Sequence, residues 1–431
     1  MAPDPSGPQP VPVSRRRVFY IPGYDPIHPR RYRELYRTES AEQAGISGYE
    51  IGITPRSGDR YGWDVAATMD GHRVQAQVEV LVWSDLVRAS MSNGIGATYL
   101  QLVRTAWTYT RSGTLRRLMW MRKGPVIAAL YPVAMLLAQA LVALVFGALA
   151  GTVVTRGLDW LADFALGLFG ATADGAIWSG ALTVLWWACL LAAGYGVLRW
   201  FKARDGKLFA YYLMHDYAHS CQLDGAYPDD LEARLKDFTD VIAHALNDDV
   251  DEVLVVGHSS GAHLGVSILA NLIRQKRVPA NGPALSFLSL GQVVPMVSFL
   301  PKADRLRADL HYLSQREELT WIDVTAPGDG CAFALCDPVA VSGVAPARGK
   351  RWPLVFSAAF TMALSEEKWK ALRWRFFRLH FQYLCAFDRP RDYDYFRITS
   401  GPLTLGARYA GREPSRSRID VAVSAHTSMA A

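Results

Sequence analysis

The chain has 431 residues, of which 50% are hydrophobic and 20% are charged. This composition excludes a wholly disordered chain, which would need fewer apolar residues and a higher net charge. The net charge of +6 is local, because residues 111–123 carry +5, residues 199–207 carry +3, residues 156–174 carry −2 and the rest balance. The charge therefore says little about a soluble anionic partner.

The N-terminal part of the chain, residues 18–110, has the pattern of the first part of an α/β domain. Residues 1–17 begin with a proline-rich stretch and are expected to be disordered. No cleaved signal peptide is expected, because the apolar stretch that follows Arg15, Arg16 and Arg17 is too short. Apolar runs and one stretch of helix-forming residues predict strands at 18–21, 49–54 and 74–83 and a helix at 29–44.

Two long apolar runs lie between the basic segments. Residues 124–155 form a run of 32 uncharged residues, and residues 175–198 form a run of 24. As helices they would be about 48 and 36 Å long, enough to cross a hydrocarbon layer of about 30 Å. Buried core helices are the alternative, but such helices are usually shorter and carry a polar stripe. We therefore expect a membrane hairpin over residues 111–207, with spans at about 125–155 and 175–198.

The charges around these runs predict the orientation of the hairpin. Basic residues lie outside both spans and the connection is acidic, which fits the positive-inside rule for two cytoplasmic ends. Residues 158–170 are expected to lie on the far surface as a short amphipathic piece. The spacing of Gly147 and Gly151 would let the two helices approach closely. The expected location is the inner membrane of a bacterium, with both termini and the remaining domain in the cytoplasm.

After the hairpin, residues 208–400 are expected to complete the α/β domain, followed by a flexible tail at 401–431. The pattern predicts helices at 205–220, 228–247, 262–275, 302–315 and 365–384, and strands at 253–256, 284–290 and 319–325. The alternation of strands and helices predicts a mostly parallel sheet flanked by helices. Five cysteines without a CxxC pair indicate neither a disulfide framework nor a zinc site.

The most informative stretch is Gly257-His-Ser-Ser-Gly261, a G-x-S-x-G motif between a predicted strand and a predicted helix. A sharp turn there would hold Ser259 in a strained conformation, and the two glycines would let neighbouring backbone pass closely. The start of the helix favours developing negative charge. The stretch resembles the nucleophile elbow of the α/β-hydrolase superfamily, which implies that Ser259 is the nucleophile. The alternative is that Ser259 and Ser260 are helix caps.

The resemblance also implies an oxyanion hole near the first strand. Val18-Phe-Tyr-Ile-Pro-Gly-Tyr-Asp looks like the oxyanion loop of the superfamily, and an ordinary Pro-Gly turn is the alternative. Gly23 and Tyr24 would offer backbone N–H groups there, together with that of Ser260. The His-Gly pair often present in such loops is missing, which leaves the choice of donor open.

The superfamily order of serine, acid and histidine places the acid after a later strand. Asp329 is favoured because it closely follows the predicted strand at 319–325. Asp337 is a rival, since Asp-Pro-Val also occurs at the acid position of hydrolases, whereas Asp323 lies inside the strand.

His380 is the remaining choice for the base, because His311 precedes the acid and His426 lies in the expected tail. Its helical surroundings depart from the usual loop of the superfamily. His380 would take the proton of Ser259 while Asp329 orients the imidazole, and the acyl group would pass to water through an acyl-enzyme. This chemistry needs no metal and no organic cofactor.

These features predict a membrane-anchored serine hydrolase, esterase-like or lipase-like, that cleaves a lipid-like or acylated carboxylic ester. The alternative is a catalytically inactive hydrolase fold that serves as a membrane scaffold or adaptor. The expected partners are the lipid bilayer and a small-molecule or lipid-like ester, without nucleic acid, and the oligomeric state stays open. Arginines and aromatic residues mix at 373–379, as on nucleic-acid surfaces, but a helix resting on an anionic leaflet explains them equally well. His215 and His219 stand four apart, but the HExxH metal motif is absent.

Overall fold

A computed structural model describes residues 12–58, 60–91, 94–173 and 175–430. The described chain forms two compact units. The sheet unit consists of the described residues up to Ser90, of Trp107–Ala128 and of the residues from His219 onward. The hairpin unit consists of the described residues of Met91–Ala106 and Ala129–Ala218. The helix pair is therefore an insertion in the chain of the sheet unit.

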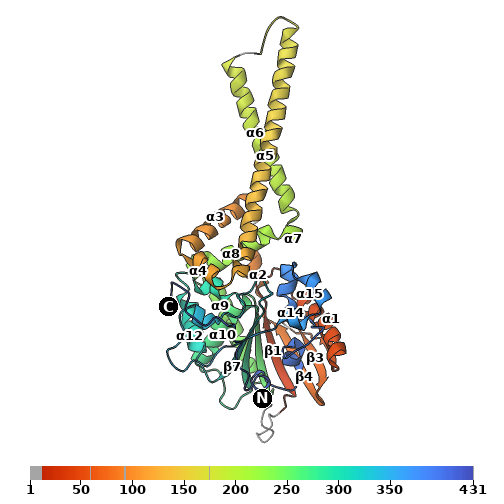
Figure 1. Cartoon of the computed structure of the whole chain (residues 1–431), viewed down its shortest axis with the longest axis vertical. Coiled ribbons are helices and arrows are strands. Elements are labelled where there is room, and N and C mark those ends of the chain that lie inside the picture. Colours follow the sequence, from red (N-terminus) through yellow and green to blue (C-terminus); the bar gives the residue numbers. More distant parts are fainter. Residues whose placement is uncertain (1–11, 59, 92–93, 174, 431) are drawn as a thin grey trace. The chain divides into compact units, whose positions relative to one another are not determined.

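The sheet unit contains an eight-stranded mixed sheet with the order β2-β3-β4-β1-β5-β6-β7-β8 (Figure 1). Strands β2 and β3 form an antiparallel edge with β4, and all other neighbours are parallel. The strands are β1 (Arg15–Ile21), β2 (Glu50–Pro55), β3 (Gly62–Met69), β4 (His72–Val80), β5 (Glu252–His258), β6 (Ala284–Leu290), β7 (Leu319–Thr325) and β8 (Leu354–Ser357). The predicted α/β class with a mostly parallel sheet is confirmed.

The strand order places a change of direction at β1. After β1 the chain builds β2, β3 and β4 on one side of it, and β5 then pairs with its other side. In open α/β sheets, ligands bind outside the carboxyl ends of the strands at such a switch point. The segments that follow β1 and β5 begin at Pro22 and Ser259. Both segments that the sequence singled out for chemistry therefore start at this point.

Helices cover both faces of the sheet. On one face, α10 (Gly261–Arg274) contacts β1, β5 and β6 and lies between α9 (Asp229–Ala245) and α12 (Asp304–Leu313). On the other face, α1 (Arg30–Ser47) and α17 (Tyr395–Ser400) share one apolar core with Val18 and Leu254. This division follows from the strand periodicity of two, since Val18 and Leu254 are register partners and face the same side.

Shorter elements complete the described chain. These are α2 (Ser84–Ser90), α3 (Ile95–Arg111), α4 (Thr114–Met121), α7 (Asp205–Leu208), α8 (Ala210–Cys221), η1 (Gln222–Gly225), α11 (Val294–Ser298), α13 (Pro338–Val341), α14 (Phe360–Ala363), α15 (Glu366–Leu372), α16 (Phe376–His380), η2 (Gln382–Leu384) and α18 (Leu405–Arg408).

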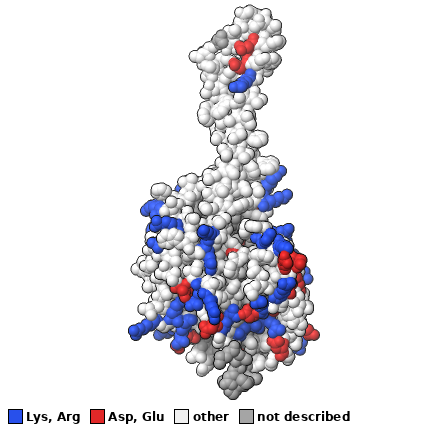
Figure 2. All heavy atoms as spheres, in the orientation of Figure 1, with Lys and Arg blue, Asp and Glu red and all other residues white. Residues whose placement is uncertain are grey.

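The two long helices are α5 (Lys123–Gly167) and α6 (Ala176–Lys202), and they pack together. A Cβ atom on Gly147 would lie 2.4 Å from the carbonyl oxygen of Leu190, and one on Gly151 would lie 2.9 Å from that of Trp186. The small residues therefore permit the close approach that their spacing predicts. By length and composition, both helices could cross a membrane, and only 22% and 11% of their most apolar stretches are buried. Figure 2 shows the middle of this pair without charged side chains on the visible face.

Several local predictions need correction. Helix α5 runs on to Gly167, so most of the expected surface piece at 158–170 continues the first long helix. The expected helix at 365–384 is divided into α15, α16 and η2, and the one at 205–220 into α7 and α8. Strands β3 and β8 were not predicted. β3 pairs antiparallel with β2 and β4, and β8 has only four residues, so long-range pairing decides both.

The C-terminal segment, expected to be a flexible tail, is hydrogen-bonded to the sheet unit. Buried Arg16 forms an ion pair with Glu252 and donates to the carbonyl oxygens of Gly401 and Leu403 at 2.8 and 2.6 Å. Further along, the N–H groups of Val423 and Ser424 each donate to the carbonyl oxygen of Val341 at 3.0 Å. The segment supplies acceptors for a buried guanidinium, which is a physical reason for its order.

Candidate active site

Ser259 lies in the turn between β5 and α10, and its backbone is strained. Its φ angle is +57°, in the left-handed region that residues other than glycine rarely adopt. Gly257 and Gly261 make the turn sterically possible. A Cβ atom on Gly261 would lie 2.1 Å from the carbonyl oxygen of Ile21, and one on Gly257 would lie 2.6 Å from that of Gly261. The elbow motif thus has a steric explanation in close backbone packing.

The loop after β1 lies directly against Ser259. A Cβ atom on Gly23 would lie 3.0 Å from Cβ of Ser259 and 3.4 Å from its Oγ. Among the described residues, the N–H groups of Gly23 and Ser260 donate to no protein acceptor. Two N–H groups without protein acceptors therefore belong to residues that adjoin the Ser259 side chain. Such donors are the components of an oxyanion hole.

Side chains from α2 and the segment before it hold this loop in place. The indole N–H of Trp83 donates to the carbonyl oxygen of Pro22 at 2.9 Å, and the Tyr24 hydroxyl lies 2.7 Å from Oγ of Ser90. Tyr24 and Trp83 are both buried. The position of the Gly23 backbone is thus supported on both sides of that residue.

Asp329 and His380 meet through a hydrogen bond. Asp329 follows β7, His380 ends α16, and Nδ1 of His380 lies 2.7 Å from Oδ2 of Asp329. Both residues are buried. Because an ionised carboxylate only accepts hydrogen bonds, Nδ1 of a neutral His380 carries the proton and Nε2 is the basic nitrogen. This tautomer is the one that a general base needs.

Further donors surround the Asp329 carboxylate. The Tyr383 hydroxyl donates to Oδ2 at 3.0 Å, and the N–H of Cys331 donates to Oδ1 at 2.9 Å. Burial, followed by the nearby Asp329 charge, raises the pKa of Tyr383 well above its ordinary value, so this hydroxyl keeps its proton. With His380, three donors satisfy a carboxylate that has no solvent around it.

His258, the residue before Ser259, positions the backbone of His380. Its Nε2 lies 3.0 Å from the carbonyl oxygen of His380, and the two rings are 4.7 Å apart. Burial, more than the neighbouring His380, lowers the pKa of His258 to about 3, so the ring is neutral and its Nε2–H donates to the carbonyl. A residue of the motif itself, His258, is thus hydrogen-bonded to the backbone of the proposed base, His380.

Ser259 and His380 both lie beside the carboxyl end of β6. The N–H of Ser259 donates to the carbonyl oxygen of Leu290 at 2.9 Å. A Cβ atom on the next residue, Gly291, would lie 3.1 Å from Cε1 of His380. Within the described chain, no hydrogen bond joins Oγ of Ser259 to the imidazole. Catalytic hydrogen bonds in unliganded sites are often longer than in the substrate complex.

The two rival acids occupy other positions. Asp337 caps α13 by accepting from the N–H groups of Val339 and Ala340, and it pairs with Lys350. Asp323 is fully buried in β7, where Oδ1 accepts from Oγ of Ser289 at 2.6 Å and Oδ2 has no partner among the described residues. Burial raises the pKa of Asp323 from 3.8 to about 8. Neither carboxylate has a hydrogen bond to a described histidine.

Asp323 is expected to make stability depend on pH. Between about pH 4 and pH 8 the folded chain keeps this proton while the unfolded chain has lost it, so stability falls as pH rises. The slope approaches about 1.4 kcal/mol per pH unit. Asp323→Asn should match the wild type near pH 4 and exceed it near pH 8 in urea unfolding. The exposed control Asp237→Asn should keep the wild-type slope, and an unchanged slope in Asp323→Asn would contradict the prediction.

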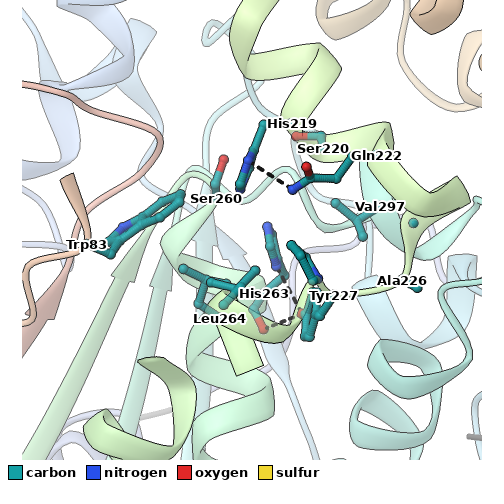
Figure 3. Close-up of a pocket in the computed structure, with 13 residues that line it drawn as sticks. Trp83, His219, Ser220, Gln222, Ala226, Tyr227, Ser260, His263, Leu264 and Val297 are labelled. Carbon is teal, nitrogen blue, oxygen red and sulfur yellow. Dashed lines mark hydrogen bonds between the residues drawn. The ribbon is translucent and has the colours of Figure 1, made fainter. Parts of the chain in front are cut away.

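A small cavity lies beside Ser260 (Figure 3). His219, Tyr227 and His263 supply polar groups, and Trp83, Leu264 and Val297 are among its apolar residues. Burial lowers the pKa of His219 to about 4 and that of His263 to about 3, so both imidazoles are neutral near pH 7. The Tyr227 hydroxyl lies 3.1 Å from Nδ1 of His263. The cavity has room for about one water molecule and no charged side chain in its lining.

Asp329, Cys331 and His380 form the one group of the described chain whose ligand atoms could hold a metal ion, all within 4.8 Å of one another. The short contact between His380 and Asp329 and the hydroxyl of Tyr383 already occupy the same carboxylate oxygen. Two of the three side chains are therefore already hydrogen-bonded to each other.

Comparisons of the chain with protein-family models, with curated proteins and with solved structures found no match. Functional inference therefore rests on the geometry of these residues.

Sequence reasoning missed His258 and Tyr383. His258 stands next to the nucleophile candidate, and Tyr383 follows His380 by three residues, a spacing that places side chains on one helical face. That spacing was the available signal, but only the contacts with Asp329 and with the His380 backbone reveal their roles.

Proposed function

We propose that the protein is a membrane-anchored serine hydrolase that cleaves a carboxylic ester through an acyl-enzyme. The observation that carries the proposal is the buried hydrogen bond between His380 and Asp329 near the strand end that also adjoins Ser259. The strained backbone of Ser259 and the N–H groups of Gly23 and Ser260 support it further.

In this mechanism, Nε2 of His380 accepts the proton of the Ser259 hydroxyl as Oγ attacks the ester carbonyl carbon. Asp329 holds the imidazole and stabilises its positive charge. The N–H groups of Ser260 and of Gly23 or Tyr24 stabilise the oxyanion of the tetrahedral intermediate. His380 then protonates the leaving alcohol, and the same residue activates water to release the acid.

The substrate class follows from the location that the two long helices suggest. We propose that α5 and α6 span the inner membrane of a bacterium with the sheet unit in the cytoplasm, since basic residues flank both spans. An enzyme held at a bilayer meets lipid-like and acylated esters at high local concentration.

The test uses the full-length chain in lipid nanodiscs. We expect covalent labelling by a fluorophosphonate probe and hydrolysis of p-nitrophenyl esters, measured for short and long acyl chains. If a folded preparation shows neither labelling nor hydrolysis, the proposal fails and an inactive scaffold becomes the better explanation. Heat-denatured protein is the control for chemical labelling without an active site.

A further inference from the structure

The segment at 373–378, here called the arginine–aromatic segment, is exposed and carries unpaired positive charge. It runs from the end of α15 into the first turn of α16 and reads Arg-Trp-Arg-Phe-Phe-Arg. Trp374 is 72% exposed and Phe376 is 45% exposed. Arg373, Arg375 and Arg378 are also exposed, and none of them forms an ion pair with a described carboxylate. The guanidinium of Arg373 lies 5.6 Å from the Trp374 ring centroid.

Among the described residues, no carboxylate of α15 forms an ion pair with these arginines. Glu366 pairs with Lys370 at 2.6 Å within α15, and Lys368 pairs with Glu42 of α1 at 3.0 Å. Both lysines of α15 thus pair with carboxylates of the protein. The three arginines have no such ion pair and are accessible to an external anion.

The segment packs on the loop that carries Asp329. A Cβ atom on Gly330 would lie 3.1 Å from Cδ1 of Phe376, and one on Gly328 would lie 2.6 Å from Cη2 of Trp369. The absence of side chains at these two glycines lets the aromatic rings lie against the loop. The exposed segment is therefore in contact with the backbone next to a proposed catalytic residue.

The same loop contacts the first residues of α5, within the sheet unit. A Cβ atom on Gly124 would lie 3.5 Å from Cα of Gly330. Nε of Arg122 donates to the carbonyl oxygen of Ala334 at 2.8 Å. The Asp329 loop thus contacts the first residues of the proposed membrane helix and also contacts the arginine–aromatic segment.

Helix α4, which directly precedes α5, carries a similar combination. Its Trp120 is 63% exposed, and the guanidinium groups of Arg116 and Arg117 lie 5.4 and 5.5 Å from the indole centroid. Arginine beside exposed tryptophan suits the boundary between lipid headgroups and acyl chains, because the indole is amphipathic and the guanidinium binds phosphate. Two such groups border the point where the chain would enter the membrane.

We infer that the arginine–aromatic segment binds the headgroups of anionic phospholipids in the leaflet from which α5 enters the membrane. This inference rests on the membrane insertion in the proposed function and adds a lipid-binding surface beside the catalytic pair. Trp374 and Phe376 would insert at the interface while the three arginines pair with lipid phosphates. Since His380 ends the helix that Phe376 begins, the lipid surface contacts the element that carries the proposed base.

An anionic bilayer fits these observations better than a nucleic acid or a second copy of the chain. The segment adjoins the start of an apolar helix, and membrane proximity there needs no further partner. A nucleic acid would pair with the same arginines, but residues 124–155 of the adjacent helix offer its phosphates no cationic side chain. A second copy would need a complementary acidic and apolar surface.

The experiment measures hydrogen–deuterium exchange of peptides covering residues 366–384 in the full-length chain. Nanodiscs of phosphatidylcholine alone are compared with nanodiscs that also contain phosphatidylglycerol. Protection should appear only with the anionic lipid and weaken in high salt. Each arginine should contribute about fivefold to the affinity of the segment for anionic lipid. The triple variant Arg373→Gln, Arg375→Gln, Arg378→Gln should therefore bind the lipid about 100-fold more weakly and lose the protection.

The matched control removes three exposed arginines elsewhere, through Arg73→Gln, Arg348→Gln and Arg416→Gln, and should keep the protection. Peptides of β5 and α10 report whether each variant is folded. The inference is overturned if exchange is equal in both lipids. It is also overturned if protection depends on protein concentration alone, or if added RNA produces it in phosphatidylcholine discs. Ser259→Ala should retain the lipid effect. If the wild type shows this effect but no probe labelling or hydrolysis, the hydrolase proposal fails while the lipid-binding inference stands.

Discussion

Ser259→Ala is expected to abolish fluorophosphonate labelling and to lower the kcat of ester hydrolysis about a million-fold. The reason is chemical, because alanine has no oxygen to form the acyl-enzyme or the phosphonyl adduct. Folding should be retained, since Ser259 contributes a hydroxyl to the site but no side-chain hydrogen bond to the described protein core. In-gel fluorescence of the labelled chain and initial rates with p-nitrophenyl esters measure the two effects.

Ser267→Ala is the matched control on the following helix. Ser267 is buried in α10, and its hydroxyl lies 3.2 Å from that of Tyr227, so the change removes a serine hydroxyl away from the elbow. Labelling of this variant should match the wild type. Equal labelling of Ser259→Ala and the wild type would refute the assignment of the nucleophile.

Asp329→Asn should lower the acylation rate about 10,000-fold with little change in the overall fold. An asparagine amide is neutral, so it neither stabilises the imidazolium nor favours the Nδ1–H tautomer as a carboxylate does. The expected loss appears in the rate of covalent labelling and in the kcat of ester hydrolysis. Exchange of the β5 and α10 peptides checks that the variant is folded.

Asp337→Asn separates the two acids that the sequence left in competition. Asp337 caps α13 and pairs with Lys350. Asparagine keeps an oxygen that can cap the helix but loses the ion pair, so the replacement should cost about 1 kcal/mol of stability. The labelling rate per folded molecule should remain near that of the wild type. A large loss of rate in Asp337→Asn together with normal labelling of Asp329→Asn would reverse the assignment.

The parts of the fold that sequence patterns predicted are those set by local periodicity. Strands β6 and β7 have the predicted bounds, and β5 and α10 begin or end within two residues of theirs. These elements are buried runs or have a clear amphipathic pattern. By contrast, β3 depends on antiparallel pairing with β2 and β4, and β8 is a four-residue parallel partner of β7. Their stability comes from distant neighbours, which no local window contains.

The candidate site shows the same division. The elbow around Ser259 could be proposed from five consecutive residues and a neighbouring predicted strand and helix. The contact between Asp329 and His380 joins residues 51 positions apart, and that between His258 and the His380 backbone spans 122 positions. The helical pattern around His380 argued against its role. In the structure that helix is broken, and the short α16 ends with this residue beside the carboxylate.

The charge pattern of +5 at residues 111–123 and +3 at residues 199–207, outside two apolar runs, is set by the sequence alone. It predicts two long helices and their orientation in a bilayer, because charge and apolar length act locally on membrane insertion. The sequence alone likewise predicted the α/β class and the serine elbow. Only the tertiary structure decided which carboxylate and which histidine meet, and that the arginine–aromatic segment lies on their loop. Those juxtapositions depend on strand order, since parallel strands bring residues far apart in the sequence to one edge of the sheet.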